Sequence, residues 1–150
     1  MGKSRNRDAG HKWERDCAKM LREIGYKDVR TSRECNRLRD AQKVDLCNSD
    51  EDTNGRLPYN IQCKTLSSSA QYSKLLRELD ENNKDKSIIN VVFHKMTQKS
   101  PSGRFLPVGE YALLNLVDFY RIIEQLKKCE DLLTESGVEL ELFTSNKINK

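Results

Sequence analysis

Residues 43–64 carry side chains whose types and spacing suit metal-dependent chemistry on a phosphodiester. Asp45 lies in KVDL, and Gln62 and Lys64 lie two residues apart in YNIQCKTL. Hydrolysis of this kind needs hard oxygen ligands for a divalent cation and positive charge near the phosphate. Asp45, the side-chain carbonyl of Gln62 and the backbone carbonyl of Cys63 offer the oxygens. Lys64 offers the positive charge and could position or deprotonate the attacking water.

A β-hairpin would bring these groups together. KVDL predicts a short strand with Val44 and Leu46 on one face and Asp45 on the other. In YNIQCKTL the strict alternation predicts a second strand whose polar face carries Gln62 and Lys64. The intervening DEDTNG has the composition of a turn. We therefore expect Asp45, Gln62 and Lys64 to converge on one side of the hairpin.

A predicted helix upstream adds a further carboxylate, Glu14. Apolar residues recur there at steps of three and four and Gly25 ends the pattern, the apolar positions being Trp13, Cys17, Met20, Leu21 and Ile24. Glu14 lies on the shoulder of this stripe. Two interpretations stay open: a rim carboxylate beside Arg15 or Arg22, or a further ligand that binds the cation directly or through water.

Basic side chains gather between the helix and the hairpin. Residues 1–45 hold 13 Lys and Arg against 8 Asp and Glu, although the whole chain has a formal charge of only +4. This surplus suits a polyanion such as nucleic acid, or is simply a solvated surface. Phosphate contacts would give salt-sensitive affinity with little base readout. The residues predicted to contact DNA are Arg30, Ser32, Arg33, Arg37, Arg39 and Lys43.

The rest of the chain predicts one α/β (α+β) domain built on a mixed β-sheet flanked by α-helices. We expect a basic N-terminal arm at 1–10, a single domain at 11–143 and a polar tail at 144–150. The later pattern comprises a helix in AQYSKLLREL, strands in SIINVVF and FLPVGEYALL, an amphipathic helix in NLVDFYRIIEQLKK and an edge strand in VELELF.

Several classes of protein are disfavoured. Five cysteines without a CxxC pair and two histidines argue against a zinc site and for reduced thiols in the cytoplasm. We expect no membrane partner, because no signal peptide and no apolar run of spanning length is present. Frames for a serine nucleophile or a phosphate-cradling glycine loop are also missing from the sequence.

The motifs resemble those of a known group of nucleases. Glu14 in KWERDCAKML, Asp45 in KVDL and Gln62-Cys63-Lys64 in NIQCK are similar to the glutamate, aspartate and (D/E)xK elements of the PD-(D/E)xK nuclease superfamily. Within it, the order of the helix, VRTSRE and the hairpin is most similar to the Holliday junction resolvases of archaeal and phage type. The resemblance covers 11–66 well, and later residues only as a pattern of elements.

The resemblance implies a restriction-endonuclease-like fold and a Mg²⁺-dependent endodeoxyribonuclease, with Mn²⁺ able to substitute. The metal ligands would be Asp45, Gln62, the backbone carbonyl of Cys63 and Glu14, the last directly or through water. A resolvase of this type is a homodimer that cuts branched DNA on opposing strands, and a phage-encoded one would act in the host cytoplasm.

Two departures from the pattern keep alternatives open. Val44 stands where proline is common, and Gln62 replaces the usual acid, which removes one negative charge from the metal site. An amide oxygen is still a hard ligand, but we expect weaker Mg²⁺ binding. The alternatives are a site-specific endonuclease of the homing or restriction type, a catalytically inactive DNA-binding module, and a structural interaction protein.

Overall fold

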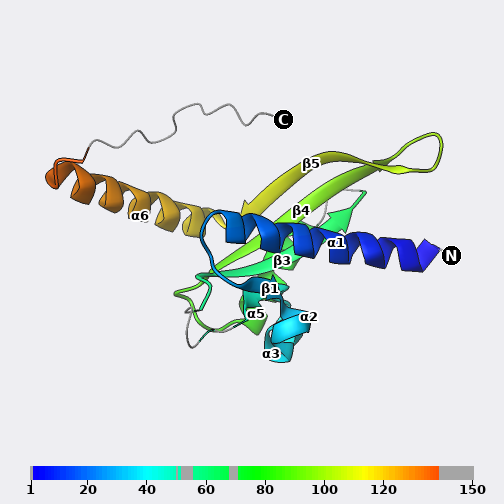
Figure 1. The fold of residues 1–150 in the computed structure, drawn as a ribbon, viewed down its shortest axis with the longest axis horizontal. Helices are drawn as coiled ribbons and strands as arrows, with labels where there is room; N and C mark the ends of the chain where they lie inside the picture. Colours follow the sequence, from blue (N-terminus) through cyan, green and yellow to red (C-terminus); the bar gives the residue numbers. More distant parts are fainter. Residues whose placement is uncertain (1, 50, 52–55, 68–70, 139–150) are drawn as a thin grey trace. The chain divides into compact units, whose positions relative to one another are not determined.

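A five-stranded β-sheet with helices against it forms the centre of the fold in a computed structural model (Figure 1). The structure describes residues 2–49, 51, 56–67 and 71–138, and the side chains from residue 6 onward. The predicted DEDTNG turn, VELELF strand and polar tail lie wholly or almost wholly outside these residues. The mixed α/β class expected from the sequence is confirmed. The chain divides into two compact units, Met1–Asn115 and Leu116–Lys150.

The strands follow the order β1-β2-β3-β4-β5 across the sheet. Their bounds are Val29–Thr31 for β1, Leu46–Asn48 for β2, Tyr59–Leu66 for β3, Ile89–Lys99 for β4 and Phe105–Leu114 for β5. Strands β2 and β3 pair antiparallel, which confirms the predicted hairpin pairing. Strands β3 and β4 are parallel, so the chain between them must cross over, and helix α5 (Tyr72–Asn82) makes the crossover.

The remaining helices are α1 (Gly2–Glu23), α2 (Ser32–Cys35), α3 (Arg37–Ala41) and α6 (Leu116–Glu135). Helix α1 differs from the sequence prediction at its start, since it is helical from Gly2 and not only from His11. Extending an existing helix costs far less than nucleating one, so the polar segment before His11 can be helical without an apolar stripe.

The sheet is covered on both faces near β3. On one face, α1 packs through Trp13, Cys17 and Leu21 against Ile61 and Cys63. This confirms the predicted inward stripe of α1, although Met20 and Ile24 are exposed.

On the other face of the sheet, α5 forms a second apolar cluster. Leu76 and Leu79 pack there with Val44 and Val92. Strand β3 therefore runs between two layers, and the polar residues Asn60 and Gln62 in it are buried.

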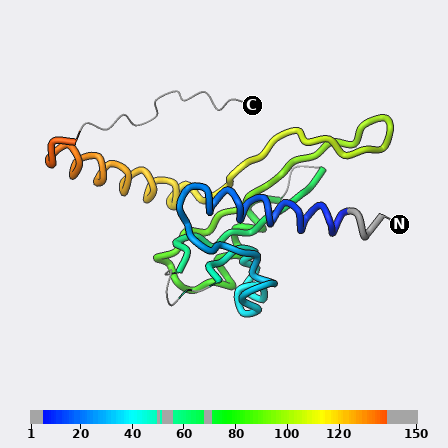
Figure 2. Tube along the Cα trace, viewed as in Figure 1, coloured from blue at the N-terminus to red at the C-terminus, as the bar shows by residue number. Residues whose placement is uncertain are grey.

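Helix α6 forms most of the second unit and is traced in yellow to orange in Figure 2. It is longer than the predicted segment, and none of its residues is buried. Gly137 (φ 74°) follows the helix, where the amide of Val138 donates to the Leu133 carbonyl (2.9 Å). Within the described parts of the chain, no helix has the length and apolar character needed to cross a membrane.

Candidate functional site

Asp45 directly precedes β2, at the end of the regular hydrogen bonding between β2 and β3. Its amide donates to the carbonyl of Ile61 (2.7 Å), and its carboxylate oxygen Oδ2 accepts from the amide of Cys63 (2.7 Å). A side-chain oxygen thus takes the place of the backbone carbonyl that a regular ladder would supply. These two hydrogen bonds involve the residues on either side of Gln62. Asp45 is therefore held beside the Gln62-Cys63-Lys64 motif.

The local geometry corrects the prediction for KVDL. Val44 packs in the cluster around α5, whereas Leu46 packs in the cluster under α1. The prediction that Val44 and Leu46 share a face is therefore wrong. The physical reason lies at Lys43, whose φ of 65° turns the chain, so that regular strand geometry starts only at Leu46.

The charges around Asp45 act on its carboxylate together. Burial, with a contribution from the negative charge of Glu14, raises the pKa of Asp45 to about 6. The Cys63 amide and the positive charges of Lys64 and Arg33 lower the pKa of the same group. Residues from α1, α2 and β3 thus form one electrostatic unit with Asp45. At neutral pH its carboxylate is mostly ionised and able to bind a cation.

Gln62 contributes an oxygen that has no internal partner. The residue is 3% exposed, and its Oε1 has no hydrogen-bond partner among the described residues. A buried polar atom left in this way costs about 1–3 kcal/mol unless a ligand or water satisfies it. Because Gln62 is in register with Val92, it lies on the α5 side of the sheet, and Glu14 acts on Asp45 from the α1 side.

The backbone of Cys63 completes the set of oxygens. Its N–H points to Asp45. Because the N–H and C=O groups of one residue in an extended strand point toward the same neighbouring strand, the Cys63 carbonyl also lies on the Asp45 side. The thiol itself is buried in the core under α1, as the sequence predicts.

Glu14 does not stand free in the structure. It is 8% exposed, and Nη2 of Arg33 forms a close ion pair with its Oε2, while Nη1 of Arg33 contacts Nε2 of His11. The ion-pair partner is thus Arg33 of α2 and not Arg15 or Arg22 of α1, and Glu14 is buried where the first interpretation placed it at the rim. The ion pair also keeps Glu14 within electrostatic range of Asp45.

An open cleft of about 220 Å³ lies beside this ion pair. The residues that line it are mostly polar or basic: Arg7, His11, Glu14, Arg15, Thr31, Arg33 and Glu34. The sequence analysis did not single out Arg7, His11 or Arg15 as phosphate contacts. Their spacing of i, i+4 and i+8 places them on one face of α1, and that periodicity is the signal that could have identified them.

The residues predicted to contact DNA fall into two groups. Arg30, Arg33, Arg37 and Lys43 are exposed. Ser32 is 0% exposed, and its amide donates to the Asp45 carbonyl (2.8 Å), so the residue before Arg33 is tied to the backbone of the candidate ligand.

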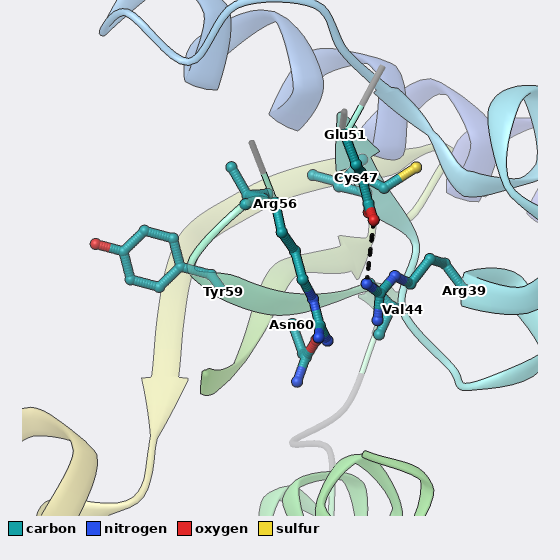
Figure 3. Close-up of a pocket in the computed structure, with 9 residues that line it drawn as sticks. Arg39, Val44, Cys47, Glu51, Arg56, Tyr59 and Asn60 are labelled. Carbon is teal, nitrogen blue, oxygen red and sulfur yellow. Dashed lines mark hydrogen bonds and ion pairs between the residues drawn. The ribbon is translucent and has the colours of Figure 1, made fainter. Parts of the chain in front are cut away.

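Arg39, like Ser32, is less accessible to DNA than the exposed basic residues. Its guanidinium pairs with Glu51 (3.3 Å) and also donates to Gln42 (3.3 Å). Figure 3 shows this ion pair beside Arg56 and Asn60, at a void of about 10 Å³. A void of that size holds one water at most. The guanidinium of Arg39 is therefore engaged within the fold, not presented on open surface.

No group of three or more His, Cys, Asp or Glu side chains gathers as a metal site among the residues that the structure describes. Amide and backbone oxygens are not members of such a group. Comparison with protein-family models, curated proteins and solved structures finds no match, so the family resemblance depends on the motifs themselves.

Proposed function

We propose that this chain is a metal-dependent endodeoxyribonuclease of the PD-(D/E)xK type that hydrolyses phosphodiester bonds in structured DNA, as Holliday junction resolvases do. The observation that carries the proposal is the Asp45 carboxylate, partly buried and hydrogen-bonded to the amide of Cys63, the residue that follows a glutamine whose amide oxygen is buried and unpartnered among the described residues. A helix followed by a hairpin in a mixed sheet flanked by helices supports the proposal of a restriction-endonuclease-like fold.

The oxygens around Asp45 fit a small divalent cation. In this proposal the ligands are the Asp45 carboxylate, Oε1 of Gln62 and the Cys63 carbonyl, while Glu14, which lies on the other face of the sheet from Gln62, acts through a water. All are hard oxygens of the kind Mg²⁺ and Mn²⁺ prefer. When bound, the metal would lower the pKa of a coordinated water and offset negative charge on the phosphate.

The basic residues of the site have separate tasks in this proposal. Lys64, whose charge acts on Asp45, orients the attacking water and receives or shares its proton. The cations of the cleft on α1 and α2 hold the DNA backbone next to the site. Cutting two opposing strands of a junction needs two such sites, so we propose a homodimer, which light scattering would test.

The competing function is DNA binding without cleavage. Two observations favour it: Gln62 supplies less charge than an acid would, and Glu14 is engaged by Arg33. Against it stands the retention of two carboxylates next to a surface that would bind a polyanion, where they only add repulsion.

A cleavage assay separates the two functions. The purified chain is incubated with a labelled four-way DNA junction or a matching linear duplex, in Mg²⁺, in Mn²⁺ or in EDTA, beside Asp45→Ala and Lys64→Ala. We expect nicking of the junction that needs metal and is lost in both variants, with their circular dichroism unchanged. Equal cutting of the duplex would indicate a general or site-specific endonuclease. Tight, salt-sensitive binding without cleavage in any metal would establish the DNA-binding module instead.

A further inference from the structure

Arg33 lies between the candidate metal site and the open cleft. Its Nη2 pairs with Glu14, its Nη1 contacts His11, and its side chain is 38% exposed toward solvent. The backbone next to it is fixed, because the amide of Ser32 donates to the Asp45 carbonyl (2.8 Å). The guanidinium can therefore exchange partners while the Asp45 backbone stays in place.

The ion pair and the proposed cation compete for the same carboxylate. Glu14 has one negative charge, and a guanidinium bound to it offsets the charge that would attract a divalent cation. The charges of both Glu14 and Arg33 reach Asp45, where they act in opposite directions on its pKa. An Arg33 that stays on Glu14 thus disfavours metal binding at Asp45.

A DNA phosphate offers Arg33 an alternative partner. The cleft of about 220 Å³ that Arg33 lines is also lined by Arg7 and Arg15 from α1. These cations favour an anion in the cleft, and a phosphate accepts the bidentate hydrogen bonds that a guanidinium makes best. The cleft therefore places the second partner of Arg33 next to the first.

We infer that Arg33 is a positioning residue that couples DNA binding to metal binding. In the free chain Arg33 holds Glu14. A DNA phosphate in the cleft takes over the guanidinium, and the released carboxylate then favours the cation through its water shell. This inference rests on the proposed nuclease function and deepens it, because it gives the site a device that favours metal loading only on substrate.

Linkage gives the inference a measurable form. If DNA raises the metal affinity by some factor, metal raises the DNA affinity by the same factor, and we expect this factor to be about tenfold. Arg33→Gln removes the competing charge and the preferred phosphate ligand. In that variant we expect metal affinity without DNA to rise severalfold, and the coupling factor to fall to about one.

The test is a Mn²⁺ titration followed by electron paramagnetic resonance, with and without a four-way DNA junction. All proteins carry Lys64→Ala, so that the DNA stays intact, and thermal unfolding shows that each is folded. Arg33→Gln is compared with Arg33→Lys, which keeps the charge but loses the bidentate fork and should retain part of the coupling. The matched control is Arg77→Gln, which removes the same charge from an exposed ion pair on α5 (Arg77–Glu81, 3.9 Å) and should leave the coupling unchanged.

The outcomes separate the inference from the function on which it rests. DNA could enhance Mn²⁺ binding equally in the protein that retains Arg33 and in the Arg33→Gln variant. That result would overturn the coupling role and leave the nuclease proposal standing. Mn²⁺ binding that DNA does not enhance in either protein would overturn the coupling role as well. A chain that binds no Mn²⁺, with or without DNA, would overturn both.

Discussion

Two arginine–glutamate pairs, Arg33–Glu14 and Arg39–Glu51, occupy very different surroundings. Both are partly buried: their side chains are 38% and 11% exposed in the first pair and 12% and 29% in the second. The first pair borders an open cleft and acts on Asp45. The second borders a small pocket of about 10 Å³ that Arg56 and Asn60 also line (Figure 3).

The difference shows that an ion pair's role depends on what can replace its partners. At Arg39 the guanidinium binds both Gln42 and Glu51, so the pair joins α3 to Glu51. At Arg33 a phosphate can enter beside the guanidinium. The same two residue types therefore stabilise the fold in one place and serve the proposed chemistry in the other.

The largest expected effect concerns Asp45, on whose carboxylate the charges of the Arg33–Glu14 pair act. Because the pKa of Asp45 is raised to about 6, the folded chain binds this proton more tightly than the unfolded chain does. The resulting stability is fully present below the unfolded pKa near 4 and is lost as the pH rises through about 6. A shift of this size is worth about 3 kcal/mol.

Urea unfolding in EDTA between about pH 4 and pH 7.5 measures this effect. We expect Asp45→Asn to gain stability relative to the parent chain as the pH rises through this window, because the amide carries no charge that burial would penalise. A constant difference between the two proteins across the window would show that Asp45 has an ordinary pKa.

The second prediction compares the two glutamates directly. Glu14→Gln should lower the rate of junction cleavage by about 100-fold, since a group that binds or orients a metal ligand is lost. Glu51→Gln should change the rate by less than about twofold, because Glu51 pairs with Arg39 and lines a different pocket from Glu14. Single-turnover rates at saturating Mg²⁺ give both numbers. Equal losses in the two variants would remove the functional distinction between the pairs.

The third prediction sharpens the account of the metal site. Gln62→Glu adds a third carboxylate to the site that Asp45 and Glu14 form and should raise Mg²⁺ affinity by about tenfold, because ligand charge sets the affinity of such oxygen sites. The Mg²⁺ concentration that gives half the maximal cleavage rate reports the change. An unchanged Mg²⁺ requirement would mean that residue 62 does not contact the cation.

The smallest effect is expected at the second pair. Arg39→Gln should cost about 1 kcal/mol of unfolding free energy, because a partly buried ion pair is worth little more than an exposed one once desolvation is counted. The variant should leave the DNA-dependent increase in Mn²⁺ affinity unchanged. Urea unfolding and the Mn²⁺ titration check the two parts, and a loss of enhancement would give both arginines the same role.

The sequence predicted the elements whose pattern is local. Strict alternation in YNIQCKTL identified β3, and helical spacing identified the buried positions Cys17 and Leu21 of α1. The pairing of β2 with β3 was predicted because the turn-like segment DEDTNG separates the two strand-like segments KVDL and YNIQCKTL. The charges of Glu14 and Lys64 act on the Asp45 carboxylate, while the role of each in a metal site stays a prediction.

What the sequence missed depends on tertiary packing. Lys43 takes a left-handed conformation without being glycine, so nothing in KVDL indicates that Val44 and Leu46 face different layers. Burial of Ser32 and the engagement of Arg39 come from neighbours distant in the chain. The apolar stripe of α6 predicted a helix correctly, but periodicity alone does not supply a partner that buries it.

The measurement that tests the central claim most directly is anomalous diffraction from crystals of the chain grown with Mn²⁺. The account predicts a Mn²⁺ ion in contact with the Asp45 carboxylate, Oε1 of Gln62 and the backbone carbonyl of Cys63. The same crystals grown with Asp45→Ala are the control and should lose this ion. Crystals in which Mn²⁺ occupies other positions while the Asp45 carboxylate and the Gln62 amide bind only protein or water would contradict it.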